Sequence, residues 1–410
     1  MATISRDERA RKGHRRGTHR LVEPRATFER VAPMRVRMGI TRVANVTGLD
    51  RIGLPVVMVC RPNSRSIAVS QGKGLDLDAA RASGLMESVE TYHAERIDLP
   101  LKLASFEVLR ERHRVIDVDG LPKVAHGRFG AGLRILWIEG QDLISTAPAW
   151  LPYEVVHTDY TLPQPAGSGC FLASTNGLAS GNHVLEAINH AICEVVERDA
   201  TAVWNHLHPT AQAATRLDLG TVDDDDCALV IERLAQAGFE VAAWDTTSDV
   251  GIPAFYCLIV DRRHENAHSG GGAGAHAARG VALLRALTEA VQVRTTYIAG
   301  SRDDLHPSEF TPPAIEQKLR RARTLMTGRG PARDFRRVPS HDGESFADDL
   351  AWLLERLQAA GVGQVVAVDL TRPELAIPVV RVVIPGLEGP DDHPRYLPGR
   401  RVQAVREGWP

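Results

Sequence analysis

A chain of 410 residues, 43% hydrophobic and 24% charged, has the composition of an ordinary globular protein and is long enough for two or three domains. Its formal net charge of -2 gives no general attraction to nucleic acid or to a membrane surface. No apolar run approaches the about 20 residues of a membrane span, and no signal-peptide core is present. The 5 cysteines are scattered without a CxxC pair, which favours a reducing cytoplasm and argues against a zinc knuckle.

The first part of the chain predicts a basic arm followed by strands and a helix. Residues 1–38 form the arm, which we expect to be solvated and partly disordered, or else to contact an acidic partner or a substrate peptide. Apolar runs over 43–59 and 65–70 predict strands. A glycine loop at 71–74 then leads into a helix over 77–96.

The middle of the chain repeats this order of strand, glycine loop and helix. The predicted elements are strands within 105–165, a Gly/Asn loop at 176–182, a helix over 184–207, a helix over 228–237 capped by Asp223–Asp226, strands over 241–244 and 252–260, a glycine loop at 270–274 and a helix over 279–298. The unit therefore occurs three times, either as an internal repeat or as a convergent nucleotide cradle.

The last part of the chain alternates irregular and regular segments. Residues 301–345 are charged and are expected to be irregular. A helix over 344–360 and strands over 365–369 and 379–384 follow. The Pro- and Gly-rich residues 386–410 predict an extended tail. The catalytic part of the chain is expected to occupy residues 39–385.

Each of the three repeated helices carries a pair of oxygen-bearing side chains at a spacing of three residues. The pairs are Glu87 and Glu90, Glu194 and Glu197, and Glu289 and Gln292. Side chains at this spacing project side by side from a helix. One interpretation is that these side chains lie on a solvated helix face. The other is that they are buried, since apolar residues surround the second and third pairs, and buried carboxylates need cations or hydrogen bonds. Glycine loops leave helix N–H groups open to anions, so the whole pattern favours magnesium and phosphate.

Three basic residues are candidates for phosphate contacts, and two of them have an alternative structural role. Arg198 and Arg294 lie at the ends of polar helix faces, where each either forms a structural ion pair or contacts a triphosphate. Lys73, in the first glycine loop, is a candidate for a phosphate contact.

Other motifs are weaker. His264-Glu265-Asn266-Ala267-His268 matches a zinc-protease pattern, but the glycines after it are poor helix formers. The glycines at 272–277 lie too far from the preceding strand for a dinucleotide fingerprint. Neither a P-loop nor a kinase signature is present.

The combined motifs resemble the YcaO superfamily over about residues 39–384. They are Ser83-x3-Glu87-x2-Glu90, Asn182-x3-Glu186-x7-Glu194-x2-Glu197-Arg198 and Glu289-x2-Gln292-x-Arg294. The resemblance implies an α+β fold of the YcaO type, with the repeated units around an ATP site that is not a P-loop. It also implies an ATP- and Mg2+-dependent enzyme that phosphorylates a backbone amide oxygen of a peptide or protein substrate. No nucleic-acid or membrane partner is implied, and a homodimer is left open.

The resemblance also implies roles for individual residues. Glu87, Glu90, Glu194 and Glu197 would hold magnesium, with Glu197 and Arg198 as the catalytic pair. The nucleotide would contact Lys73, Ser83, Asn182, Glu186, Arg198, Gln292 and Arg294.

Three features favour the thioamide-forming branch of that superfamily, which works with a partner called TfuA. The stretches 39–50 and 379–386 look like that branch. Azoline-forming cyclodehydratases often end in Pro-x-Pro-x-Pro, whereas this sequence ends in Arg406-Glu407-Gly408-Trp409-Pro410, and no fused substrate-binding domain is expected before residue 39. The alternatives are an azoline-forming cyclodehydratase and an ATP-binding accessory factor for modification of a ribosomal protein.

Overall fold

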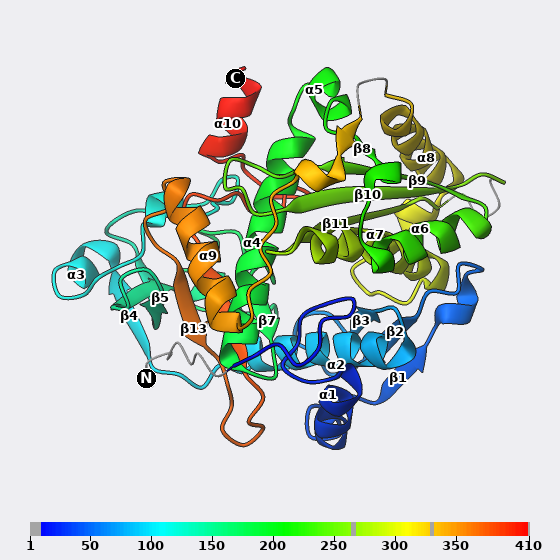
Figure 1. The fold of residues 1–410 in the computed structure, drawn as a ribbon. Coiled ribbons are helices and arrows are strands. Elements are labelled where there is room, and N and C mark those ends of the chain that lie inside the picture. The colour runs from blue at the N-terminus through cyan, green and yellow to red at the C-terminus, as the bar shows by residue number, and fades with distance from the viewer. Residues whose placement is uncertain (1–9, 264–267, 329–331, 409–410) are drawn as a thin grey trace. The chain divides into compact units, whose positions relative to one another are not determined.

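The computed structural model describes residues 10–263, 268–328 and 332–408. Its contacts divide the chain into two compact units that interleave along the sequence. Unit 1 contains residues 1–11, 89–206 and 343–410, and unit 2 contains residues 12–88 and 207–342. Both units combine helices with largely antiparallel sheets (Figure 1), so the predicted α+β class is confirmed. The predicted segment 39–385 contributes to both units.

Unit 1 is built on a sheet with the strand order β4-β5-β13-β14-β7, and β6 pairs with β5. Every residue of β14 is buried, because this strand lies between two neighbours and under helix α4. Helix α9 packs on α4, where the Asn189 side chain donates to the Phe346 carbonyl at 2.8 Å. The elements are β4 (Leu101–Ser105), α3 (Phe106–Arg110), β5 (Arg134–Asp142), β6 (Pro148–Pro152), β7 (Leu178–Ser180), α4 (Val184–Asn205), α9 (Phe346–Ala359), β13 (Val366–Asp369), β14 (Val379–Val383) and α10 (Arg400–Arg406).

Unit 2 contains two three-stranded antiparallel sheets, β1-β2-β3 and β11-β10-β9, and a short parallel pair, β8 with β12. Helix α2 begins in unit 2 and ends in unit 1. The elements are α1 (Pro24–Val31), β1 (Arg42–Asn45), β2 (Val56–Cys60), β3 (Val69–Lys73), α2 (Leu77–Ala94), α5 (Pro209–Ala213), β8 (Leu217–Asp218), α6 (Asp225–Gln236), β9 (Phe239–Asp245), β10 (Ala254–Asp261), β11 (Gly270–Ala275), α7 (Arg279–Ala299), α8 (Pro312–Met326) and β12 (Arg333–Asp334).

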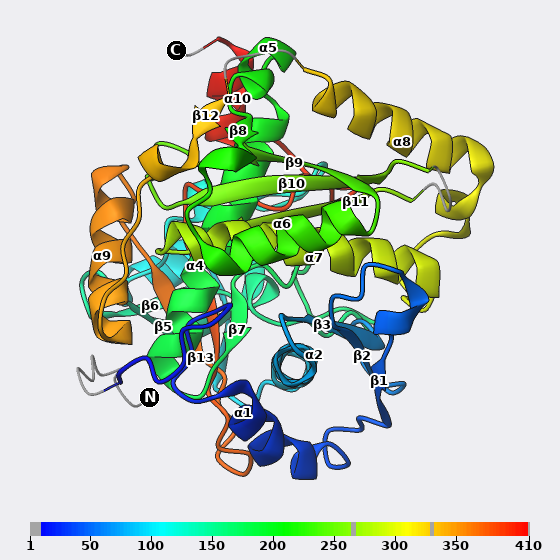
Figure 2. The ribbon, with the colours of Figure 1, turned by 45° about the vertical axis from the view of Figure 1, so that its right-hand side comes forward.

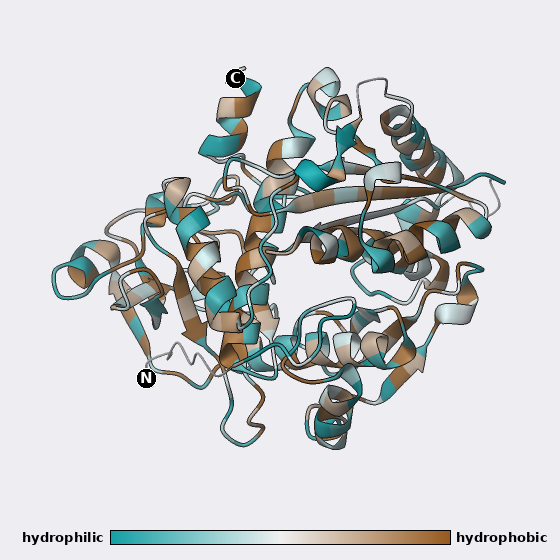
Figure 3. Ribbon diagram, in the orientation of Figure 1, coloured by the Kyte–Doolittle hydropathy of each residue, from teal (hydrophilic) through white to brown (hydrophobic). Residues whose placement is uncertain are grey.

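Helices α6 and α7 cover one face of the β9-β10-β11 sheet (Figure 2). Alternate residues of β10, namely Phe255, Cys257 and Ile259, point into this core, as the two-residue period of a strand requires. Figure 3 shows β10 and β13 as mainly hydrophobic segments, which matches their burial. Burying such runs supplies the main stabilising free energy of each unit.

Most of the predicted helices and strands are confirmed within a few residues. The long helices α2, α4 and α7 start at the predicted positions. The acidic run before α6 caps that helix as predicted, since the Asp224 side chain accepts from the Cys227 N–H at 2.9 Å.

Two segments predicted to lack regular structure are helical. Helix α8 lies inside the segment 301–345, where two prolines in its first turn start the helix and buried Ala322 and Met326 anchor it at a spacing of four residues. Helix α10 lies in the tail that was expected to be extended. The buried Glu388 carboxylate explains its start, because it accepts from the N–H groups of Gly399 and Val402 at 2.8 and 3.0 Å. Residues 409 and 410 lie outside the described part of the chain, as do residues 264–267 of the zinc-protease pattern.

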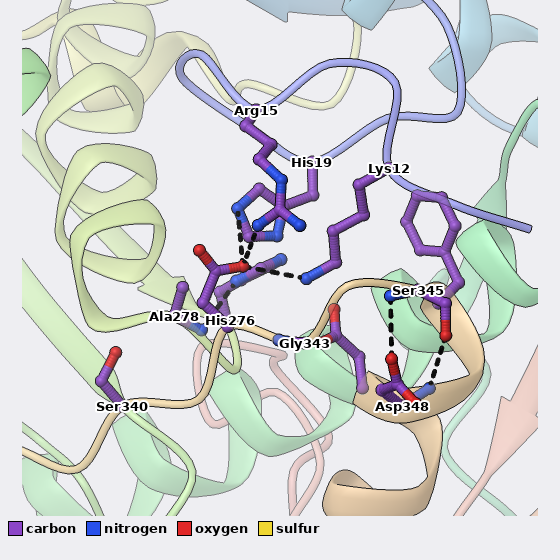
Figure 4. Close-up of polar contacts among 12 residues, drawn as sticks. Lys12, Arg15, His19, His276, Ala278, Ser340, Gly343, Ser345 and Asp348 are labelled. Carbon is purple, nitrogen blue, oxygen red and sulfur yellow. Dashed lines mark hydrogen bonds and ion pairs between the residues drawn. The ribbon is translucent and has the colours of Figure 1, made fainter.

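Residues 12–38 of the basic arm belong to unit 2 and are folded, whereas a solvated segment was one of the two expectations. Lys12, Arg15 and His19 surround the carboxylate of Asp342 at 3.1, 2.5 and 3.7 Å (Figure 4). The Lys12 side chain is fully buried, so this ion pair ties the arm to the end of unit 2. Burial, and the neighbouring charge of Lys12, lower the pKa of His19 to about 4.

The buried His93 of unit 1 gives a prediction for acid stability. Its Nδ1 bonds to the Val89 carbonyl at 2.7 Å, and burial lowers its pKa from 6.5 to about 4. His93 is therefore protonated near pH 6.5 in the unfolded chain but only near pH 4 in the folded protein. The free energy of unfolding is greatest above pH 6.5 and falls as the pH drops from 6.5 to 4. The loss of folding free energy should approach about 3 kcal/mol. In urea titrations the variant His93→Asn, which does not titrate, should show a shallower decline; an equally steep decline would contradict the assignment.

Candidate functional site

Two of the three glycine stretches predicted as loops are mainly strands, whereas in the stretch 176–182 only Leu178–Ser180 is a strand and both glycines lie outside it. Gly72 lies in β3, and Gly270, Gly272 and Gly274 lie in β11. A Cβ atom at Gly72 would lie 2.0 Å from the Ala80 carbonyl oxygen of α2. The glycines therefore let a helix pack directly on its strand, and they do not form a flexible phosphate loop.

Each of these strands still leads through a short turn into the helix that bears a predicted pair. The successions are β3 to α2, β7 to α4 and β11 to α7. At the ends of two of these strands, Lys73 of β3 bonds to Glu289 of α7, and Ser180 of β7 bonds to Glu90 of α2. This arrangement produces one polar cluster in unit 2 and another in unit 1.

The cluster of unit 2 joins β3 to α7. The Lys73 ammonium pairs with a Glu289 carboxylate oxygen at 2.6 Å, and both side chains are only partly exposed. One turn along α7, the Gln292 amide donates to the Gln71 side-chain oxygen at 3.1 Å. Lys73 and Gln292, predicted from widely separated segments, therefore lie in one network, and Gln71 and Glu289 connect them.

Glu87 joins this cluster from α2. Its carboxylate accepts from the Gln71 N–H at 3.3 Å. Removal from water raises the pKa of Glu87 to about 7, although the nearby Arg302 charge opposes the rise. A carboxylate that is this reluctant to ionise gains a large electrostatic stabilisation from any bound cation. Ser83 lies one turn earlier on α2 and is partly buried.

The cluster of unit 1 gathers the remaining predicted acids around α4. The Ser180 N–H and hydroxyl both donate to one Glu90 oxygen, at 2.9 and 2.7 Å. The Asn182 amide donates to the Glu186 carboxylate at 3.2 Å, and Glu186 lies in the first turn of α4. Sequence analysis missed Ser180, whose position at the end of a strand two residues before Asn182 is the signal that could have found it.

Glu194, Glu197 and Arg198 follow on the next turns of α4. Glu197 is 2% exposed and Glu194 is partly exposed. The Arg198 guanidinium lies 3.8 Å from a Glu197 oxygen. The spacing of positions 194 and 197 places their acidic groups on one side of α4.

Arg294 lies apart from these side chains. Its guanidinium is 1% exposed, pairs with Asp50 at 2.7 Å, approaches Asp261 at 3.8 Å and stacks 4.8 Å from the Phe239 ring. The His268 carbonyl accepts a further hydrogen bond from it. These contacts within unit 2 account for its burial, and its predicted role at a nucleotide stays a prediction.

The donor set fits magnesium. Glu87, Glu90, Glu194 and Glu197 offer only oxygen ligands, which Mg2+ prefers, and no soft sulfur or imidazole ligand accompanies them. Among the described residues, no three acidic, histidine or cysteine side chains already converge on one point. Coordination by these glutamates would use water molecules and phosphate oxygens for the remaining positions, as is usual for Mg2+.

Comparison with known proteins decides the family. The family model for YcaO cyclodehydratases, described as ATP- and Mg2+-binding, matches residues 71–388. The chain belongs to the YcaO family. ATP and Mg2+ are the cofactors of this family, and its members are ATP-dependent enzymes that modify peptides. The expected resemblance and fold are therefore confirmed.

Two relatives of this YcaO chain come from a bacterium and an archaeon. A protein of Rhizobium leguminosarum bv. trifolii, described as an uncharacterized protein in the tfuA 3' region, is 38% identical over 90% of this chain and 88% of its own length. An uncharacterized protein of Methanothermobacter thermautotrophicus is 33% identical over 93% of this chain and 98% of its own length.

Solved structures share the fold of this YcaO chain. A heterocyclase in complex with substrate and cofactor has a TM-score of 0.78 at 24% identity, and the match covers 96% of this chain and 56% of that chain. YcaO from Methanopyrus kandleri bound with AMPPCP and Mg2+ has a TM-score of 0.76 at 24% identity, over 96% of this chain and 99% of that one. Within the residues described for the present chain, every helix is too short or too polar to serve as a membrane span.

Proposed function

We propose that this YcaO protein converts a backbone amide of a peptide or protein into a thioamide, with ATP, Mg2+, a sulfide source and a TfuA-like partner. The observation that supports this branch is the relative in the tfuA 3' region, which is 38% identical to this chain over nearly its full length. We further propose a cytoplasmic location for the reaction.

Phosphorylation converts the amide oxygen, which is a poor leaving group, into a phosphate ester oxygen, which is a good one. The amide oxygen takes the γ-phosphoryl group of ATP, and ADP leaves with the electrons of the broken P–O bond. Sulfide then bonds to the amide carbon, and inorganic phosphate departs with the former amide oxygen and the electrons of the C–O bond. Such a reaction depends on positioning and charge neutralisation, so no covalent enzyme intermediate is required.

The polar clusters supply residues for these tasks. Glu87, Glu90, Glu194 and Glu197 are the proposed magnesium ligands, and Ser180 fixes the rotamer of Glu90 through two hydrogen bonds. Asn182, Glu186 and Arg198 are the proposed nucleotide contacts of unit 1. Lys73, Ser83, Gln292 and Arg294 are proposed as nucleotide contacts in unit 2, with Arg294 the one already committed to a buried network.

Two other functions differ in their products. The family description and the heterocyclase likeness support an azoline-forming cyclodehydratase. A non-catalytic ATP-binding factor is the alternative of another class. Intact-mass measurement of candidate peptides after incubation with ATP, Mg2+, sulfide and the partner distinguishes all three. Exchange of one oxygen for sulfur supports our proposal, loss of one water supports the cyclodehydratase, and no change despite ATP binding supports the accessory factor.

Arg198→Ala should weaken nucleotide binding. Mg2+ with ATP is expected to raise the melting temperature of the wild-type protein, because a ligand of the native state stabilises it by mass action. The variant should show a clearly smaller rise, since the planar guanidinium lost is well suited to phosphate. Thermal melts with and without millimolar MgATP measure the effect. An undiminished rise would remove Arg198 from the phosphate site, and no rise in the wild type would count against the nucleotide site itself.

A further inference from the structure

Arg381 is an arginine in the middle of an otherwise aliphatic, buried strand of unit 1. It occupies the centre of β14, opposite Val368 of β13 and Leu178 of β7. Its exposure is 2%, and all five residues of the strand are buried. The sequence analysis treated this stretch only as a hydrophobic strand.

The guanidinium of Arg381 is poorly satisfied by the protein. Its Nη2 donates to the Ser174 carbonyl at 2.7 Å. Its Nε and Nη1 are buried and meet no acceptor among the residues that the structure describes. Glu194 is near enough for its charge to act on Arg381, yet no described carboxylate forms an ion pair with this side chain. Burial lowers the pKa of Arg381 to about 10, so the group remains a cation at neutral pH.

Other unsatisfied polar atoms lie on segments next to Arg381. The loop that supplies the Ser174 carbonyl also carries Asn176, whose buried side-chain oxygen has no partner among the described residues. This loop runs along β14, because the Val382 N–H donates to the Gly177 carbonyl at 2.8 Å. Tyr160 also lies within electrostatic reach of the guanidinium.

Arg294 of the same chain is a buried arginine with a structural role, and it serves as a comparison for Arg381. It is as buried as Arg381, but two aspartates, a carbonyl and an aromatic ring surround its guanidinium. A buried cation without such partners is costly, so it persists in a fold when its partner is an anion that binds from outside. The planar, forked donor set of arginine matches phosphate oxygens in particular.

We propose that Arg381 binds the phosphoryl group that passes from ATP to the substrate amide, and the inorganic phosphate that leaves afterwards. This inference rests on the proposed function. Glu194, an acid whose charge acts on Arg381, is one of the proposed magnesium ligands, so the phosphate oxygens would be shared between a metal on α4 and a guanidinium on β14. A fixed cation in a dry site stabilises the charge of a transferring phosphoryl group without reorganising first.

Arg381→Met tests this role because it removes the charge while keeping an unbranched apolar chain. The melting temperature should stay within about 2 °C of wild type or rise, since an uncompensated buried charge is lost. Turnover should fall at least about 100-fold. Inorganic phosphate added to MgADP should raise the melting temperature of the wild type but not of the variant. Arg381→Lys should recover part of the turnover.

Arg294→Met is the matched stability control. Because it breaks a fully paired buried network, its melting temperature should fall by at least about 6 °C. A comparable fall for Arg381→Met would show a structural role and overturn the inference. So would an equal effect of phosphate on the wild type and Arg381→Met. If the wild type itself shows neither an ATP-induced rise nor turnover, the proposed function fails; if it shows both and Arg381→Met matches it, only the role of Arg381 fails.

Discussion

Glu197→Gln should reduce turnover by at least about 100-fold, equivalent to about 2.7 kcal/mol of barrier, while leaving the fold intact. Glu197 is 2% exposed on α4, and glutamine fills nearly the same volume. The substitution removes one negative charge from a group of acids proposed to hold Mg2+, so the metal and the phosphate oxygens that it positions are held less firmly. Steady-state assays across a range of Mg2+ concentrations, together with thermal melts, measure both effects.

Asp199→Asn is the matched control for this prediction, because Asp199 is a fully buried acid two residues further along α4. Its carboxylate forms an ion pair with Arg401 at 2.8 Å and accepts from the Glu388 N–H at 2.9 Å, which ties α4 to the C-terminal segment of unit 1. Its loss should lower the melting temperature but preserve the magnesium dependence of turnover. Wild-type turnover with unaltered magnesium dependence in Glu197→Gln would remove Glu197 from the metal site.

The long helices were predictable because their sequence signals are local. Apolar residues at helical spacing define α2, α4 and α7, and the pairs at i and i+3 follow from the same geometry. The glycine stretches were misassigned because composition alone does not separate a mobile loop from a strand that lies under a helix. For Gly270, Gly272 and Gly274 of β11 the decisive facts are their distances to α7, which are tertiary contacts.

Helices α8 and α10 were missed for a related reason. Each is short or highly charged, and each depends on partners distant in sequence, such as the Glu388 carboxylate that caps α10. The basic arm was misjudged because Lys12 has its partner, Asp342, at the other end of unit 2. Intrinsic propensity is a weak prior for such segments, and tertiary contacts override it.

In the candidate site too, local sequence patterns predict some residues, whereas their partners are distant in sequence and could not be predicted. The paired acids of α2 and α4 could be selected from spacing, whereas Asn182 and Glu186 followed only from the family resemblance. The partners that orient them could not, because Ser180 reaches Glu90 across 90 residues of chain and Lys73 reaches Glu289 across 216. The residues next to Arg294 and Arg381 in the sequence do not reveal which partners either arginine has. Only their surroundings separate a paired structural cation from an unpaired one.

Gly272→Ala should destabilise unit 2 by at least about 3 kcal/mol, because this glycine lies in close contact with backbone atoms of α7. A Cβ atom there would lie 2.4 Å from both the Ala286 carbonyl oxygen and the Ala290 backbone nitrogen. Both are backbone atoms of a rigid helix, so α7 would have to move away from the strand. Because α7 carries Glu289 and Gln292, the displacement should also disturb their bonds to Lys73 and Gln71.

Gly271→Ala, one residue earlier, is the control because its Cβ would point to the opposite face of β11. The nearest atom there is the Tyr256 hydroxyl at 2.6 Å, the far end of a side chain that can rotate. We therefore expect a loss below about 1 kcal/mol for Gly271→Ala. Thermal melts of the two variants should differ by about 4–8 °C, at roughly 2–4 °C per kcal/mol for a unit of this size. Equal melting temperatures would mean that α7 tolerates a Cβ atom, and that the glycines of β11 serve a purpose other than close packing.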